Sequence, residues 1–236
     1  MVMKGKATIV LVHGAFAESS SWEGVIKTLI EQGYPIVAAA NPLRSVKYDF
    51  DYVSNLLQSI HGPIVLVGHS YGGMVLPANP NVIGLVYVAG LAPDIGESAA
   101  DLVGRFPGSS LNPTLSSVKL PDGSTDLYIQ QDKFWAQFAA DVPEAQAKLM
   151  AATQRPIVEA AFGEVYGIPA WKTIPSWFIF GELDKNIPAA AHRFMAQRAG
   201  AKEIVEVKGA SHVVMISHPD AVAKLIVAAA QPVPVG

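Results

Sequence analysis

The sequence predicts an α/β fold, with a mostly parallel central sheet flanked by helices. Short apolar runs alternate with amphipathic helical patterns along most of the chain, and one run leads directly into a glycine–serine turn. The strand-like runs are residues 7–12, 35–40, 63–67, 82–89, 175–180 and 203–208. The first five are apolar nearly throughout, which is typical of strands buried on both faces of a parallel sheet. The sixth alternates apolar and charged residues, which favours a place near the sheet edge.

Helical patterns separate these runs. They cover residues 22–32, 49–60, 188–199 and 217–230. In the first, Trp22, Val25 and Leu29 fall on one stripe, and Gly33 ends the pattern. Strands that alternate with helices indicate parallel pairs joined by right-handed crossovers.

Residues 93–173 break this alternation. A loop rich in Gly, Ser and Pro spans about 104–117, and short helical patches follow at 126–140 and 143–152. We therefore expect a helical cap inserted between two strands of the sheet. The core would then consist of residues 1–92 and 174–236.

The composition narrows the class of protein. The chain has 236 residues, half of them apolar, and a mean hydropathy of +0.30, which suits one compact unit with an insertion. A net charge of −3 with scattered Lys and Arg predicts no nucleic-acid surface. The absence of cysteine excludes thiolate nucleophiles and Cys-based metal sites.

The apolar runs also bear on membranes and location. The longest, 62–68 and 82–91, are far shorter than the ~20 residues of a membrane-spanning helix, so no membrane span is expected. The first dozen residues lack the apolar region and cleavage site of a signal peptide. A cytoplasmic protein is the expectation, and a leader removed before this numbering stays open.

The pattern G-x-S-x-G occurs at Gly68-His69-Ser70-Tyr71-Gly72, directly after the run 63–67. A serine on a sharp strand-to-helix turn projects its hydroxyl above the sheet, and the flanking glycines leave room where side chains would clash. This context predicts Ser70 as a nucleophile. Prolines at 77 and 80 predict that the helix after the turn is short.

A serine nucleophile needs a base. Of the six histidines, His212 lies in a loop after the last strand, at the sheet edge where α/β active sites form. The orienting acid should lie on another such loop between Ser70 and His212. Asp184 fits this position, and Asp94 is the rival.

The remaining histidines receive structural interpretations. His69 should pack near the top of the sheet, and His13 should make a structural hydrogen bond. His192 lies inside an expected helix beside Arg193 and should be exposed.

Several segments carry a family resemblance. They are Val10-Leu11-Val12-His13-Gly14-Ala15, Gly68–Met74, Val86–Gly90 with Ala92-Pro93-Asp94, Gly181–Asp184 and Gly209–His212. On these motifs the chain resembles the α/β-hydrolase superfamily, particularly its small branch of plant methyl-ester esterases, hydroxynitrile lyases and related bacterial esterases. The motifs span nearly the whole chain in the expected order, and the segment 93–173 matches the family's cap in position and size.

Two backbone N–H groups should stabilise the oxyanion. One belongs to Tyr71, the residue after the nucleophile, and the other should come from the loop after the first strand. The resemblance implies Ala15 as this second donor, with Phe16 as the alternative. Aromatic residues of this loop and the cap are expected to line an apolar pocket, among them Phe16, Trp135, Phe138 and Phe162.

These observations predict a carboxylesterase-type serine hydrolase acting on small to medium apolar esters. No metal or cofactor is expected, and the chain should be a monomer or a homodimer. The resemblance leaves alternatives: a small-molecule receptor with little turnover, a lyase, or a perhydrolase on the same triad. Hydroxynitrile lyases of the branch typically carry Thr where Gly14 stands and Lys after the histidine, where this chain has Val213. Both departures favour an esterase.

Overall fold

A six-stranded, wholly parallel sheet forms the centre of the computed structural model, which describes residues 5–165 and 167–231. Its order is β2-β1-β3-β4-β8-β9. The strands are β1 (Thr8–Val12), β2 (Ile36–Ala39), β3 (Ile64–His69), β4 (Val82–Val88), β8 (Ser176–Gly181) and β9 (Glu203–Val207). The predicted parallel sheet is thus confirmed, and every expected strand-like run forms one of its strands.

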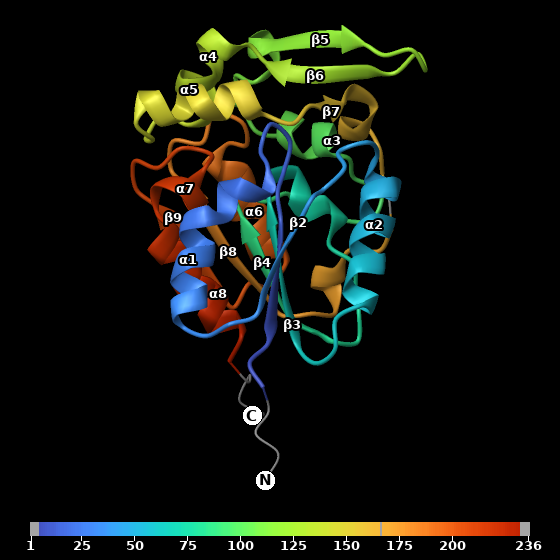
Figure 1. Ribbon diagram of the computed structural model, residues 1–236. Coiled ribbons are helices and arrows are strands. Elements are labelled where there is room, and N and C mark those ends of the chain that lie inside the picture. Colours follow the sequence, from blue (N-terminus) through green and yellow to red (C-terminus); the bar gives the residue numbers. More distant parts are fainter. Residues whose placement is uncertain (1–4, 166, 232–236) are drawn as a thin grey trace.

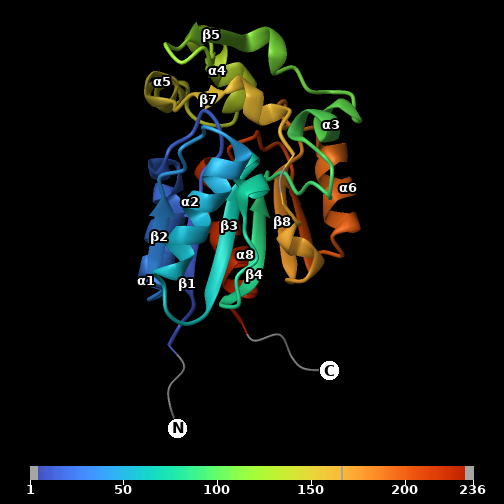
Figure 2. The same ribbon diagram turned by 90° about the vertical axis from the view of Figure 1, so that its right-hand side faces the viewer.

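Helices cover both faces of this sheet (Figures 1 and 2). One face carries α1 and α8, which pack against each other, and the other carries α2 and α6. These helices are α1 (Glu23–Glu31), α2 (Val46–Gln58), α6 (Ala189–Arg198) and α8 (Pro219–Ala229), with the short α7 (Val214–Ser217) just before α8. All four predicted helices are present within a few residues of their expected ends.

Burial of the strands follows their place in the sheet. β3 is buried at every residue, and β1 and β4 nearly so. β9 lies at one edge, as its alternating sequence predicts. β2 forms the other edge and is only half-buried, so the expectation that it is covered on both faces is wrong. The apolar sequence of β2 did not indicate this, because the order of strands in the sheet places β2 at the edge and that order cannot be inferred from the composition of one strand.

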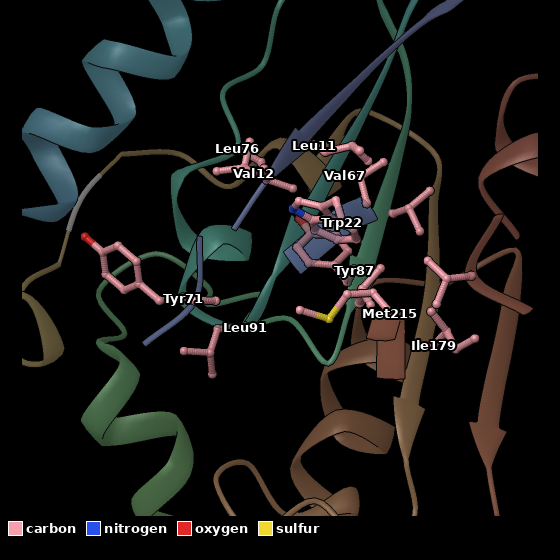
Figure 3. Packing of buried hydrophobic residues seen from close by; sticks show 14 of the residues in the cluster. Leu11, Val12, Trp22, Val67, Tyr71, Leu76, Tyr87, Leu91, Ile179 and Met215 are labelled. Atoms are coloured by element: carbon pink, nitrogen blue, oxygen red, sulfur yellow. The ribbon is translucent and has the colours of Figure 1, made fainter. Parts of the chain in front are cut away.

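The core lies between the sheet and its helices. Figure 3 shows Trp22, Tyr87 and Met215 among the buried side chains of this core. Tyr87 also stacks on Phe178 of the neighbouring β8, with ring centroids 4.5 Å apart. Tyr71 points away from this cluster (Figure 3).

The segment between β4 and β8 lies over the carboxyl ends of the strands (Figure 1). It contains α3 (Ala99–Gly104), α4 (Gln131–Phe138) and α5 (Glu144–Thr153). It also contains a three-stranded antiparallel sheet of β5 (Leu115–Lys119), β6 (Thr125–Ile129) and β7 (Ile157–Val158). The helical patch expected at 126–140 is therefore partly wrong, because its first residues form β6.

A hairpin explains this difference. Asp122-Gly123 is a common turn dipeptide, and Gly123 adopts a φ of +88°, which favours glycine. Thr125, Leu127 and Ile129 then alternate with polar neighbours, the period of a strand.

The helix after Ser70 is short, as the prolines predict. It is a 3-10 helix, Ser70–Val75, and the next residue, Leu76, is extended. A residue before proline avoids the helical region, so Pro77 fixes this end. Among the described residues, no helix has the length and apolar character needed to cross a membrane.

Candidate active site

Ser70 occupies a strained turn at the end of β3. Its φ is +52°, a left-handed conformation rarely adopted by a serine. The turn is tightly enclosed: a Cβ at Gly72 would lie 2.5 Å from the carbonyl oxygen of Val12, and one at Gly68 would lie 2.8 Å from that of Gly72. The glycines of the motif are therefore required by close backbone approach.

Ser70, His212 and Asp184 lie in a single hydrogen-bonded chain. The Nε2 atom of His212 lies 2.8 Å from the Oγ atom of Ser70, and its Nδ1 atom lies 2.7 Å from Oδ2 of Asp184. All three side chains are buried, with Ser70 9% exposed. Nδ1 must donate to a carboxylate, so Nε2 is left free to accept the serine proton.

Asp184 accepts four hydrogen bonds. The main-chain N–H groups of Asn186 and Ile187 donate to Oδ1 at 2.8 and 2.9 Å. His212 and His192 both face Oδ2. Burial raises the pKa of Asp184, but His212, His192 and these bonds outweigh it and hold the pKa below its usual range. The carboxylate is therefore charged at neutral pH.

His192 differs from its sequence-based prediction. It was expected to be exposed, but it is fully buried, and its Nε2 atom lies 3.1 Å from Oδ2 of Asp184. Its ring stacks on Phe180, with centroids 4.9 Å apart. Burial lowers the pKa of His192, so the ring is neutral and donates through Nε2. A helical periodicity shows which face a residue occupies only when the buried face is known, and the polar neighbour Arg193 was misleading.

The other candidates lie elsewhere. Asp94 is on the surface and pairs with Lys172 at 2.7 Å, away from His212. His69 is buried at the sheet top beside His212, with ring centroids 4.9 Å apart. His13 is buried and its Nδ1 atom lies 2.9 Å from the carbonyl oxygen of Gly14, the structural role expected of it.

Two backbone N–H groups lie beside Ser70. The loop after β1 packs so closely that a Cβ at Gly14 would lie 2.6 Å from Cβ of Ser70 and 3.1 Å from the nitrogen of Tyr71. The N–H of Phe16 is engaged, because it donates to the carbonyl oxygen of Arg155 at 2.9 Å. The N–H of Ala15 has no such partner in the described part of the chain. This arrangement leaves Ala15 and Tyr71 as the available donors.

The side chain of Tyr71 is tied to α2. Its hydroxyl donates to Oδ2 of Asp49 at 2.9 Å, and the N–H of Arg44 donates to the other oxygen. The Arg44 guanidinium in turn pairs with Asp126 of β6 at 2.8 Å. The side chain of Tyr71 is thus anchored to α2, and Arg44, just before α2, links this contact to the segment above the sheet. The sequence analysis did not identify this role of Asp49, because no local motif shows that Asp49 and Tyr71 meet.

A cavity of about 380 Å³ opens above Ser70. Its lining has no charged side chain among the described residues and comprises Ala15, Phe16, Ser70, Tyr71, Leu91, Ala99, Ala100, Val103, Gly104, Phe106, Pro107, Gly108, Ser109, Leu111, Asn112, Phe162, Asn186 and Ile187. Phe16 and Phe162, two of the residues expected to line a pocket, are among these. Phe138 instead packs against His212 and Phe16, and Trp135 is partly exposed with its Nε1 atom bonded to the carbonyl of Val142.

The site has the groups for acyl transfer. It combines a serine hydroxyl, an imidazole, a carboxylate and two main-chain N–H groups beside a largely apolar cavity. In residues 5–165 and 167–231, no three His, Asp or Glu side chains gather in a way that could hold a metal ion.

The chain is similar to known proteins over nearly its whole length. A model of the alpha/beta hydrolase family matches residues 9–225. Norfluorocurarine synthase 2 from Strychnos sp is 27% identical, over 92% of this chain and 93% of its own. Salicylic acid-binding protein 2 from Nicotiana tabacum is 25% identical, over 92% and 94%. The crystal structure of polyneuridine aldehyde esterase superposes with a TM-score of 0.82 at 18% identity, covering 96% of this chain and 100% of that one.

Proposed function

Because this chain belongs to the alpha/beta hydrolase family, we propose that it hydrolyses carboxylic esters through an acyl-enzyme on Ser70. The hydrogen-bonded chain from Ser70 through His212 to Asp184 carries the proposal. The esterase named among the structural neighbours supports the same reaction class. A metal is not needed for it, because the base and the oxyanion donors are supplied by the chain.

The mechanism follows from the geometry. His212 accepts the Ser70 proton at Nε2 as Oγ attacks the ester carbonyl, and Asp184 stabilises the imidazolium that forms. The N–H groups of Ala15 and Tyr71 donate to the oxyanion. His212 then protonates the departing alcohol. A water molecule, activated by His212, attacks the acyl-enzyme and releases the acid.

The cavity favours small to medium neutral esters. Its lining is largely apolar and carries no charged side chain in the described residues, so a substrate with a free carboxylate would lose its hydration without a counter-ion. An uncharged acyl or alcohol group instead gains from burial.

Ser70→Ala tests the nucleophile. We expect kcat for a short p-nitrophenyl ester to fall by at least about 10⁴-fold while the thermal unfolding temperature stays near that of the wild type, because the change removes only the attacking oxygen. A fluorophosphonate probe should add once to the wild type, at Ser70, as measured by intact mass. Wild-type activity in the variant would overturn the mechanism. An adduct without turnover would instead indicate a receptor.

Asp184→Asn tests the acid. An amide cannot hold the His212 tautomer or stabilise its positive charge, so we expect kcat to fall by roughly 10³- to 10⁴-fold. Asp94→Asn is the matched control and should leave kcat nearly unchanged, because Asp94 pairs with Lys172 on the surface. The opposite order of effects would assign the acid to Asp94.

A further inference from the structure

Gln137, on α4, is buried and its side-chain amide has one orientation. Its Nε2 atom donates to the main-chain carbonyl of Lys185 at 3.0 Å and to Oδ1 of Asn186 at 2.7 Å. Its Oε1 atom accepts from the hydroxyl of Ser110 at 2.8 Å. A main-chain carbonyl only accepts hydrogen bonds, so turning the amide over would set two oxygens against each other. The carbonyl of Lys185 thus fixes which end of Gln137 is the donor.

This orientation determines that of Asn186. The atom of Asn186 that faces the Gln137 donor must be the acceptor Oδ1, so Nδ2 lies on the other branch of the amide. Asn186 is 4% exposed and lines the cavity above Ser70. None of the hydrogen bonds among the described residues uses Nδ2 as a donor. Nδ2 is not one of the fully buried polar atoms that lack a partner, so this unpaired donor is accessible to a molecule in the cavity.

The surroundings suggest what the partner is. The cavity lining is mostly apolar and has no carboxylate among the described residues, and none of the acceptors in it is hydrogen-bonded to Nδ2. The other amide in the lining, Asn112, begins a short 3-10 helix, is exposed and can be solvated. Asn186 follows Asp184 by two residues, and its own N–H donates to that carboxylate. Its side-chain donor is therefore held on the same loop as the acid of the proposed triad.

We propose that Nδ2 of Asn186 donates a hydrogen bond to a second acceptor oxygen of the substrate, away from the bond that is cleaved. The preferred substrate is then a neutral ester that also carries a carbonyl or ether oxygen. Asn186 is a specificity-determining residue, and Gln137 is the positioning residue that fixes its amide. This inference rests on the proposed function, because it assumes that Ser70 attacks an ester bound in the cavity.

Two pairs of esters of nearly equal shape test the proposal. Ethyl 4-oxopentanoate and ethyl 4-methylpentanoate differ by an acyl-side oxygen, and 2-methoxyethyl butanoate and butyl butanoate differ by an alcohol-side oxygen. The rate of acid release gives kcat/KM for each ester. Each value is then divided by the rate constant for alkaline hydrolysis of the same ester, which corrects for its intrinsic reactivity. We expect the wild type to prefer the oxygen-bearing ester about tenfold in at least one pair, since a donor held in a mostly apolar cavity discriminates against an analogue that lacks the acceptor.

Asn186→Asp is the decisive variant. It keeps an oxygen facing Gln137 but replaces the donor with an acceptor, so the preference should fall to about one or reverse. A ratio within one variant cancels the effect of the added charge on Asp184. Asn112→Asp is the matched control in the same cavity and should keep the wild-type preference. Gln137→Leu removes the donor that fixes the Asn186 amide, so the amide can turn over and the preference should weaken. If Asn186→Asp does not fold, the Gln137→Leu variant tests the proposal in its place.

The outcomes are distinct. Hydrolysis of all four esters with wild-type ratios near one overturns this inference and leaves the proposed function standing. A preference that survives in both Asn186→Asp and Gln137→Leu also overturns it. Failure to hydrolyse any of the four overturns the proposed function, and the inference with it.

Discussion

At the residue scale, two histidines share one carboxylate oxygen. Oδ2 of Asp184 lies 2.7 Å from Nδ1 of His212 and 3.1 Å from Nε2 of His192. The negative charge that stabilises a protonated His212 is therefore partly taken up by a neutral donor. The other titratable groups around this pair are His69 from β3 and Glu206 from β9, which pairs with Arg193.

His192→Phe should reveal what this second donor contributes to activity. Without it one side-chain hydrogen bond to Asp184 is lost and the carboxylate holds His212 less firmly, so we expect kcat for ester hydrolysis to fall roughly several-fold, with KM near that of the wild type. His192→Gln, which can still donate, should keep most of the wild-type kcat. If the Phe variant has a lower unfolding temperature but an unchanged kcat, His192 serves packing alone.

Sequence reasoning identified the candidate nucleophile, base and acid because each lies in a turn or loop that follows a strand, and because their order along the chain is distinctive. It missed the roles of His192 and Asn186 for a physical reason. The function of each side chain depends on a partner from another element: Asp184 for His192 and Gln137 for Asn186. No local spacing marks such a pair.

At the scale of elements, the turn between β3 and its 3-10 helix is limited by backbone contacts. The register of β1 on β3 places Val12 opposite Gly68, which brings the end of β1 against the turn. Main-chain atoms cannot move aside as a flexible side chain can. The strand pattern predicted this sheet well, whereas the small sheet above it was missed because β5 is mostly polar and β7 has two residues.

Gly72→Ala should therefore be costly. Its Cβ would meet the carbonyl oxygens of Val12 and His13 at 2.5 and 2.9 Å, so we expect a loss of at least about 2 kcal/mol in the free energy of unfolding. Ester hydrolysis should fall as Ser70 is displaced. Gly163→Ala is the control, since its Cβ would meet only an ordinary contact at 3.9 Å. Equal stability of the two variants in urea would contradict this account of the turn.

At the scale of the whole molecule, buried histidines make stability depend on pH. Burial lowers the pKa of His13 to about 4 and also lowers the pKa values of His69 and His192. The unfolded chain binds protons at these sites near pH 6.5, before the folded chain does. Their contribution is complete above that value and is lost as the pH falls. Asp49 acts in the opposite sense, because burial raises its pKa.

We expect the free energy of unfolding in urea to be lower at pH 5 than at pH 7. For His13 alone, the loss between pH 6.5 and pH 4 amounts to about 3 kcal/mol. His13→Gln removes one of these groups and should flatten the dependence. A wild-type stability that does not change over this range would show that the histidines bind protons equally well in both states.

The hydrogen bond from Phe16 to Arg155 has a consequence for recombining such proteins. Phe16 follows Ala15 on the loop beside Ser70 and has a φ of +60°, and its N–H is held by a carbonyl of the segment between β4 and β8. That segment therefore covers the candidate active site and also helps to fix the loop that carries Ala15 and Phe16. A chimaera that receives this segment from a relative must bring a carbonyl oxygen to the same place. Without that carbonyl, the loop that carries Phe16 loses a hydrogen bond. The N–H group of Ala15, the proposed oxyanion donor, is then no longer aligned, even if the new segment changes the substrate specificity.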